Sequence, residues 1–184
     1  MQGQTKHADF DNRWYKPGRN GLVRALWHFC NSCLLMSFLP GNGWRRALLR
    51  LFGADVGKCV VIKPRVNIKY PWNLAIGEHS WIGEGVWIDN LGKVKMGSNC
   101  CISQGALLLC GNHNYRKPAF DLMVGDITLE NGVWIGAKAM VCPGVICHSH
   151  AVLTAGSIAT TALEAYKIHS GNPAVAVKER NIEA

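Results

Sequence analysis

Charged residues are scarce in this chain: Asp, Glu, Lys and Arg make up 17% of its 184 residues, whereas hydrophobic residues make up 48%. Chains that stay disordered have the opposite balance, with few apolar residues and many charges. The composition therefore excludes disorder as the main state. The length suits one domain with a short appendage.

Long hydrophobic runs are absent as well. The most apolar stretch, Leu22–Leu39, is interrupted by Arg24 and His28 and is followed by Pro40, whereas a bilayer-spanning helix needs about 20 mostly apolar residues. The first ten residues are polar and lack the apolar run that follows a basic start in a signal peptide. We therefore expect a cytoplasmic protein, either free or at the inner face of the membrane, with its eight cysteines reduced.

Acidic residues are rare in the first third of the chain. Residues 1–69 contain 12 Lys or Arg against Asp9, Asp11 and Asp55, a balance of +9, while residues 70–184 have a balance of −1. Such a distribution suits an anionic partner, either a membrane surface, a phosphate-bearing ligand or nucleic acid, or it is a solvated basic face. Nucleic acid is the weakest of these partners, because the basic residues form no recognised motif and lack an aromatic stacking platform.

Residues 1–53 are expected to form an N-terminal extension with two helical segments. The first is Leu22–Leu39, and a turn at Gly41–Gly43 separates it from the second, Trp44–Phe52, where arginines alternate with leucines. A basic helix beside an apolar one is typical of a helical cap on a larger domain and also of a peripheral membrane contact. The sequence favours the cap and leaves the membrane contact open.

From residue 56 onward the sequence repeats with a period of six. Each unit has an aliphatic residue, often followed by Gly, then two variable residues and a small residue or Val. Six residues match neither the 3.6 of a helix nor the alternation of a strand, but they fit a short strand followed by a corner. Clear copies begin at Val56, Ile76, Ile82, Met96, Ile102, Ile135, Val141 and Leu153.

Three such units make one triangular coil, and because one coil cannot bury its own core, the coils must stack into a solenoid. We therefore predict an all-β solenoid, a parallel β-helix, over residues 54–168, with residues 169–184 as a C-terminal tail packed on it. The aliphatic residue of each unit should point inward and stack on its copy in the next coil. The Gly is expected to permit backbone conformations that a Cβ would hinder. A β-sandwich of short strands is the less consistent alternative.

The repeat has one large break, after residue 107, and returns at Ile127. An excursion from a solenoid usually lies on the functional face, so we expect a protruding active-site loop over about residues 111–126. It contains His113, and imidazoles ordinarily titrate near neutral pH, so this side chain can accept a proton from a hydroxyl and pass it on. Cys110 is a second candidate, as a nucleophile, although the phase of the repeat points it inward.

Several segments resemble one family. They are Lys69–Trp72 (Lys-Tyr-Pro-Trp), Gly111–Tyr115 (Gly-Asn-His-Asn-Tyr), Trp134–Ala137 and Gly171–Ala174 (Gly-Asn-Pro-Ala). They resemble the hexapeptide-repeat acyltransferases, in the branch of colanic-acid-type polysaccharide O-acetyltransferases, and the likeness extends from about residue 10 to the C-terminus. The resemblance implies a left-handed β-helix, although general chain physics would favour the right-handed connection.

The same resemblance implies an activity, which is transfer of acetyl from acetyl-CoA to a sugar hydroxyl in the biosynthesis of exopolysaccharide or a related glycan. It places the general base at His113 and requires no metal. It also implies a homotrimer with active sites between subunits. The acceptor would be a sugar or glycan, either free or lipid-linked.

The site residues that the resemblance implies can be read off the sequence. Asn90, on the coil before the break, and Asn114 and Tyr115, beside His113, would contact the acceptor, although Asn90 also fits a structural corner position. Acetyl-CoA would lie along the solenoid edge, against Trp134, Gly136, Ala137, Ala155, Gly156, Thr160 and Thr161, with Lys178 or Arg180 at its phosphates.

One departure from the family and two alternatives stay open. Asn114 stands where the family usually has Asp, so a charge beside the base is missing. The protein could instead be a non-catalytic, membrane-associated assembly component of a polysaccharide cluster. A γ-type carbonic anhydrase needs histidines converging on zinc, two of them five residues apart, and the residue five after His113 is Pro118.

Overall fold

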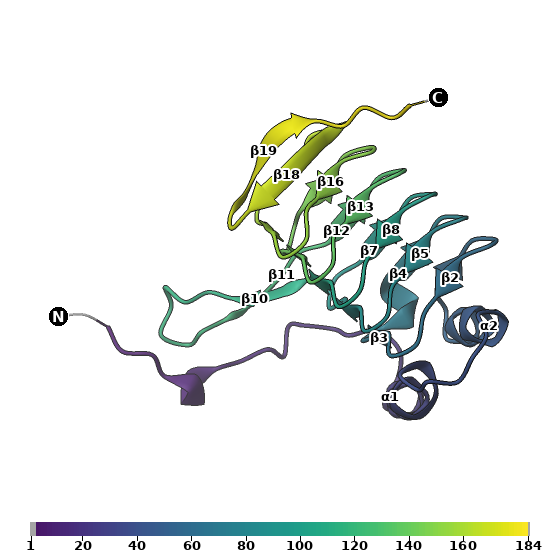
Figure 1. Ribbon diagram of the computed structural model, residues 1–184. Helices are drawn as coiled ribbons and strands as arrows, with labels where there is room; N and C mark the ends of the chain where they lie inside the picture. Colours follow the sequence, from purple (N-terminus) through teal and green to yellow (C-terminus); the bar gives the residue numbers. More distant parts are fainter. Residues whose placement is uncertain (1–2, 184) are drawn as a thin grey trace.

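The computed structural model describes residues 3–183, and within them three parallel sheets form the walls of a triangular solenoid (Figure 1). The chain passes from sheet A to sheet B to sheet C in each coil. Sheet A contains β1 (Asp55–Val56), β4 (Leu74–Ile76), β7 (Val94–Met96), β12 (Ile127–Leu129) and β15 (Ile146–Cys147). Sheet B contains β2 (Val61–Ile62), β5 (Trp81–Ile82), β8 (Cys101–Ile102), β13 (Trp134–Ile135), β16 (Val152–Leu153), β18 (Lys167–Gly171) and β19 (Ala174–Glu179). Sheet C contains β3 (Asn67–Ile68), β6 (Trp87–Asp89), β9 (Leu107–Leu109), β14 (Met140–Val141) and β17 (Ile158–Ala159).

The core consists of three columns of buried aliphatic side chains, one behind each sheet. Strand register places each aliphatic residue against its copy in the next coil, which confirms the prediction from the repeat. In sheet B the column is Ile62, Ile82, Ile102, Ile135 and Leu153, all fully buried. Each such side chain contributes about 1.5–3 kcal/mol by leaving water.

The glycine of the repeat has a different role from the one predicted. Gly77 does not adopt a positive φ, but a Cβ there would lie 2.4 Å from the carbonyl carbon of Gly97 in the next coil. The left-handed conformation falls two residues later, at His79 (φ 58°). The Gly therefore allows close approach of adjacent coils, and the strained corner residue is a separate position.

The N-terminal helices cover the exposed edge of the first coil, as the cap prediction required (Figure 1). They are α1 (Gly21–Cys30), the π-helical turn η2 (Asn31–Leu35) and α2 (Gly43–Leu51). On α1, Trp27 Nε1 donates to the Ile68 carbonyl, and after it Asn31 Oδ1 accepts from the Ile68 amide. On α2, Arg50 donates to the Val56 carbonyl. These bonds satisfy edge groups that no preceding coil can reach.

Two hairpins depart from the solenoid winding. β10 (Gly111–His113) pairs with β11 (Leu122–Val124) in the predicted loop region, and β19 pairs antiparallel with β18. The expected boundary after residue 168 falls inside β18, which continues sheet B by pairing with β16. The remaining helical turns are η1 (His7–Asp9) and η3 (Pro71–Asn73). No helix within residues 3–183 is long and apolar enough to cross a membrane.

Candidate active site

His113 is the last residue of β10, in the hairpin that interrupts the solenoid between β9 and β12. Cys110 is still fully buried, and from Gly111 the chain leaves sheet C and pairs with β11, so that His113 lies opposite Leu122. The backbone amide of Asn114 then donates to the carbonyl of Asp121. The histidine is thus held on a paired segment rather than on an irregular loop.

The orientation of the His113 imidazole is set by Phe120. Nδ1 lies 2.8 Å from the Phe120 carbonyl oxygen, and the two rings are stacked with centroids 4.5 Å apart and planes 7° apart. A carbonyl oxygen only accepts hydrogen bonds, so Nδ1 is the protonated nitrogen and Nε2 has the lone pair. Within the described residues no group is hydrogen-bonded to Nε2. This is the tautomer that a general base requires.

His113 lines a cavity of about 580 Å³, which we call the acceptor pocket. Its walls come from the hairpin, the solenoid corner, α1 and the N-terminal segment: Phe10, Asn12, Tyr15, Pro17, Arg24, Lys69, Tyr70, Leu91, His113 and Leu122. The Phe10 ring lies 5.6 Å from the imidazole, between centroids. The pocket is large enough for a sugar ring and combines aromatic faces with polar groups.

The N-terminal segment forms one wall of this pocket and is called the strap, residues 3–17. It is attached firmly at its C-terminal half, where Tyr15 donates its hydroxyl to the Leu91 carbonyl and Trp72 Nε1 donates to the Pro17 carbonyl. Burial raises the pKa of Tyr15 well above its ordinary value, so the phenol stays a donor. Nearer its start, the amide of Lys6 donates to the Pro118 carbonyl of the hairpin.

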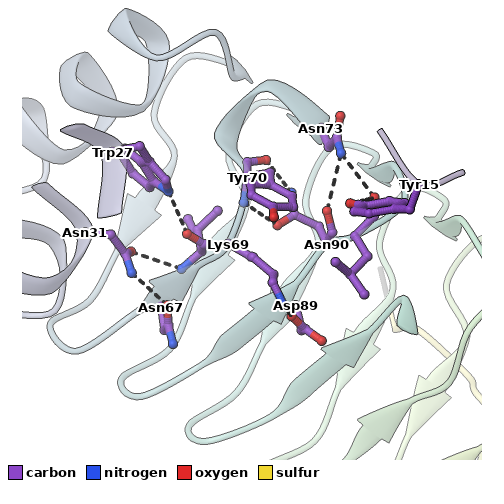
Figure 2. Close-up of polar contacts among 11 residues, drawn as sticks. Tyr15, Trp27, Asn31, Asn67, Lys69, Tyr70, Asn73, Asp89 and Asn90 are labelled. Carbon is purple, nitrogen blue, oxygen red and sulfur yellow. Dashed lines mark hydrogen bonds and ion pairs between the residues drawn. The ribbon is translucent and has the colours of Figure 1, made fainter. Parts of the chain in front are cut away.

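Asn90 does not face the pocket as predicted. Its side chain is fully buried, Nδ2 donates to the Tyr70 carbonyl at 2.6 Å, and Oδ1 accepts from the Tyr70 amide at 2.9 Å (Figure 2). Both ends of the amide are therefore used to hold the preceding corner. The structure therefore favours the corner role that the sequence also allowed for Asn90 over a contact with the acceptor.

An ion pair next to Asn90 reaches the acceptor pocket through Lys69. Lys69 Nζ is 2.9 Å from Asp89 Oδ1, too poorly aligned for a hydrogen bond, with side chains 39% and 10% exposed (Figure 2). Lys69 lines the acceptor pocket, and both residues line a second cavity of about 610 Å³ between α1 and sheet C. The two cavities adjoin, because both are lined by Arg24, Lys69 and Tyr70.

The other predicted acceptor contacts are not brought into the pocket by this chain. Asn114 accepts from the Arg116 amide through Oδ1 at 3.1 Å, which makes it a turn-forming residue of the hairpin. The Tyr115 side chain is 75% exposed and does not line the acceptor pocket. Tyr115 is therefore accessible to a ligand only outside the acceptor pocket of its own chain.

Four of the predicted acetyl-CoA residues lie together at a different corner. Gly136 and Ala137 follow β13, and Ala155 and Gly156 follow β16, so they lie where sheet B turns into sheet C. The amide of Gly156 donates to the Ala137 carbonyl, which places these corners directly above one another. A Cβ on Gly136 would meet the Ala155 amide nitrogen at 2.5 Å. His113 lies at the opposite end of the sheet C strands.

The remaining predicted acetyl-CoA residues are scattered. Trp134 is 46% exposed on sheet B and, with Trp81, lines a groove of about 480 Å³. Thr160 and Thr161 are exposed and follow β17, on the same side of the prism as the hairpin. Lys178 is exposed on β19. Arg180 donates to two backbone carbonyls and is therefore less free to hold a phosphate.

A cysteine nucleophile and a metal site are the two other chemistries that the sequence raises. Burial raises the pKa of the Cys110 thiol to about 12, so a thiolate nucleophile is not available there near neutral pH. His148 forms a surface pair with Glu130 (Nδ1 to Oε1, 3.1 Å). No group of three or more His, Cys, Asp or Glu that could hold a metal occurs within residues 3–183.

Comparison with known proteins places this geometry in a family. No family model matches the chain. WcaF of Escherichia coli K12, assigned as a colanic acid biosynthesis acetyltransferase, is 39% identical over 137 residues, which cover 74% of this chain and 75% of WcaF. The chain belongs to the hexapeptide-repeat acetyltransferases, in the colanic acid branch.

More distant relatives agree with this assignment. The galactoside O-acetyltransferase of E. coli K12 is 29% identical over 141 residues, which cover 74% of this chain and 69% of that enzyme. The hexapeptide-repeat acetyltransferase VCA0836 of Vibrio cholerae, solved with acetyl coenzyme A, superposes with a TM-score of 0.78 at 19% identity over 88% of both chains, which shows a common fold. The solenoid of this acetyltransferase is accordingly the left-handed parallel β-helix that the resemblance implied.

Sequence reasoning missed several residues of this acetyltransferase's pocket. Phe10, Tyr15 and Arg24 come from outside the repeat, so no period marks them. A signal did exist for the corner that contains Lys69. Successive core residues are six apart at the other corners, but Ile68 and Ile76 are eight apart, and so are Ile88 and Met96. The extra residues lengthen the same corner that later contains His113.

Proposed function

We propose that this acetyltransferase transfers the acetyl group of acetyl-CoA to a hydroxyl of a sugar acceptor in polysaccharide biosynthesis, with His113 as the general base. The observation that supports this most is the imidazole of His113, which donates from Nδ1 to the Phe120 carbonyl and lines a pocket of sugar size. The assignment of WcaF to colanic acid biosynthesis, and the galactoside acceptor named for a second relative, support a glycan acceptor.

The steps of acetyl transfer follow from the tautomer of His113, which is protonated on Nδ1. His113 Nε2 accepts the proton of the acceptor hydroxyl while that oxygen attacks the thioester carbonyl. The C–O bond forms, the C–S bond breaks, and the imidazolium returns its proton to the departing CoA thiolate, so the proton lost by the sugar ends on the CoA thiol. The Phe120 carbonyl stabilises the imidazolium through the Nδ1 hydrogen bond. A general base at this position contributes about 10²–10⁴-fold in rate.

The position of the predicted donor residues supports a homotrimer. Gly136, Ala137, Ala155 and Gly156 lie at one end of the sheet C strands and His113 lies at the other. We propose that the acetyl-CoA groove of one subunit meets the acceptor pocket of the next. Exposed tryptophans on the flat outer faces of sheets B and C, Trp81, Trp134 and Trp87, suit such a contact.

Acetyl-CoA fits the chemistry of this corner. The exposed Ala155 and Gly156 offer backbone groups with almost no side chain, which suits a narrow pantetheine arm, and Lys138 and Lys178 are exposed cations of the kind that phosphates need. No metal is required, because base and leaving-group acid are the same imidazole. The proposal includes a cytoplasmic location.

The direct test is acetyl transfer by the purified protein. Acetyl-CoA is supplied with a panel of sugars and oligosaccharides, and free thiol is followed. Thiol release with at least one acceptor, and a loss of about 10²-fold or more in kcat for His113→Ala, is expected. Met123→Ala, at an exposed position on the paired strand of the same hairpin, is the matched control and should keep most of the activity. Unchanged turnover in His113→Ala would remove His113 from the mechanism, and absence of thiol release with every acceptor would favour the non-catalytic assembly component.

A further inference from the structure

Helix α1 presents three different faces. Trp27 is buried against the first coil, while Arg24 and His28 line the cavity between α1 and sheet C. The third face contains Leu22, Leu26 and Phe29, spaced by four and three residues, and these side chains are 79%, 53% and 61% exposed. That spacing aligns them in one stripe along the helix.

Apolar exposure continues in the chain after α1. We call the whole set the apolar end surface, because α1 lies at the end of the solenoid opposite to β18 and β19 (Figure 1). Clusters of exposed large apolar side chains usually mark an interaction site. Its members are Leu22, Leu26, Phe29, Leu34, Met36, Phe38 and Leu39, which are between 37% and 79% exposed.

The charge around this surface is of one sign. Residues 12–54 contain no Asp or Glu. Arg19 precedes the helix, and the Arg65 guanidinium lies 5.6 Å from the centre of the Phe38 ring. An apolar stripe with flanking arginines is complementary to a bilayer that contains anionic lipids, because the apolar side chains enter the acyl boundary and the cations meet the headgroups.

A second copy of this chain is the main rival for the surface. Two-fold pairing would bring each stripe against its copy and would also bring arginine against arginine. A bilayer surface with anionic lipids does not impose this repulsion between like charges. The helix is also pre-formed, since Asn20 Oδ1 accepts from the Val23 amide at its N-terminus.

We propose that the apolar end surface docks the protein onto an anionic bilayer, with α1 lying in the headgroup plane. The cavity between α1 and sheet C, and with it the adjoining acceptor pocket, then lies close to the membrane, which suits an acceptor borne on a membrane lipid. This consequence for the acceptor rests on the proposed function, whereas the docking does not.

The test is co-sedimentation of the full chain with vesicles of phosphatidylcholine alone and of equal parts phosphatidylcholine and phosphatidylglycerol. Binding to the anionic vesicles, weakened by high salt, is expected. The double variant Leu26→Ser/Phe29→Ser should lose about 10-fold or more in partitioning. The matched control is Val175→Ser/Val177→Ser, because these exposed residues (59% and 55%) lie on β19 at the opposite end.

Failure of the wild type to bind anionic vesicles, or equal binding by Leu26→Ser/Phe29→Ser, would overturn the proposal. A lower oligomeric mass of that variant in sedimentation velocity would also overturn it, since the stripe would then be a subunit interface. Thiol release with a soluble sugar should be unchanged in the variant. If thiol release is absent for every acceptor while vesicle binding persists, the proposed activity fails and the docking stands.

Discussion

Replacing Asn90 by Ala should destabilise the protein rather than weaken acceptor binding. The substitution leaves the partly buried Tyr70 amide and carbonyl without their partners. Each unsatisfied group costs about 1–3 kcal/mol, so the two together are expected to lower the free energy of unfolding by about 2–6 kcal/mol. For a domain of this size that lowers Tm by about 4–24 °C.

The variant Asn90→Asp tests the same bonds, with a loss of stability whose size depends on pH. One carboxylate oxygen can still accept from the Tyr70 amide, but the other faces the Tyr70 carbonyl, which also only accepts. Burial and this repulsion raise the pKa of the introduced carboxyl above its unfolded value of about 4. Its destabilising effect is therefore smallest below that unfolded pKa and grows as pH rises towards the folded pKa.

Both variants are measured by urea denaturation, with the acceptor KM determined for whatever fraction remains folded. Asn73→Ala is a suitable control, because its amide makes only long hydrogen bonds of 3.3 and 3.4 Å at the same corner. An unchanged unfolding midpoint for Asn90→Ala, combined with a raised acceptor KM, would refute the reasoning. It would restore Asn90 as a substrate contact.

Three further outcomes are expected. Tyr15→Phe removes the hydroxyl that holds the strap to the Leu91 carbonyl, so acceptor KM should rise several-fold while the KM for acetyl-CoA stays unchanged in steady-state kinetics. Cys110, whose thiol pKa is raised to about 12 by burial, should resist iodoacetamide at pH 8 while the exposed Cys33 and Cys59 are labelled, and mass spectrometry of peptides would reveal any exception. Asn114→Asp keeps the hairpin turn but adds a negative charge next to His113, and this charge favours the protonated imidazole. The acid limb of the kcat/KM profile should therefore move to higher pH. An unmoved limb would mean that this side chain has no influence on the base.

The solenoid could be predicted from the sequence because its determinants are local and repeated. Every aliphatic position at the start of a unit, from Val56 to Leu153, is buried in a column behind a sheet. The break at Gly111 was equally visible, since a regular array makes its own interruption conspicuous. The expected helical cap was also found, as α1, η2 and α2.

Contacts between distant segments could not be predicted in this way. Nothing in the sequence shows that Tyr15 reaches Leu91 or that Arg24 borders the pocket of His113. The sequence left the role of Asn90 open, because a polar residue at a corner suits a ligand contact and a backbone clamp equally well. Only its burial separates the two readings.

The location of the pocket follows from extra residues at one corner of the prism, between sheet C and sheet A, in three successive coils. Core residues are eight apart from Ile68 to Ile76 and again from Ile88 to Met96, and in the third coil the same corner expands into the hairpin of His113. The strand register is unbroken on both sides of each insertion, with Leu74 opposite Val94 and Val94 opposite Ile127. Insertions at this corner therefore leave the pairing of the strands in the core unchanged. The corner can change its side chains for a new acceptor while the glycine-containing corner at the other end of sheet C, which the coils need for close approach, stays fixed.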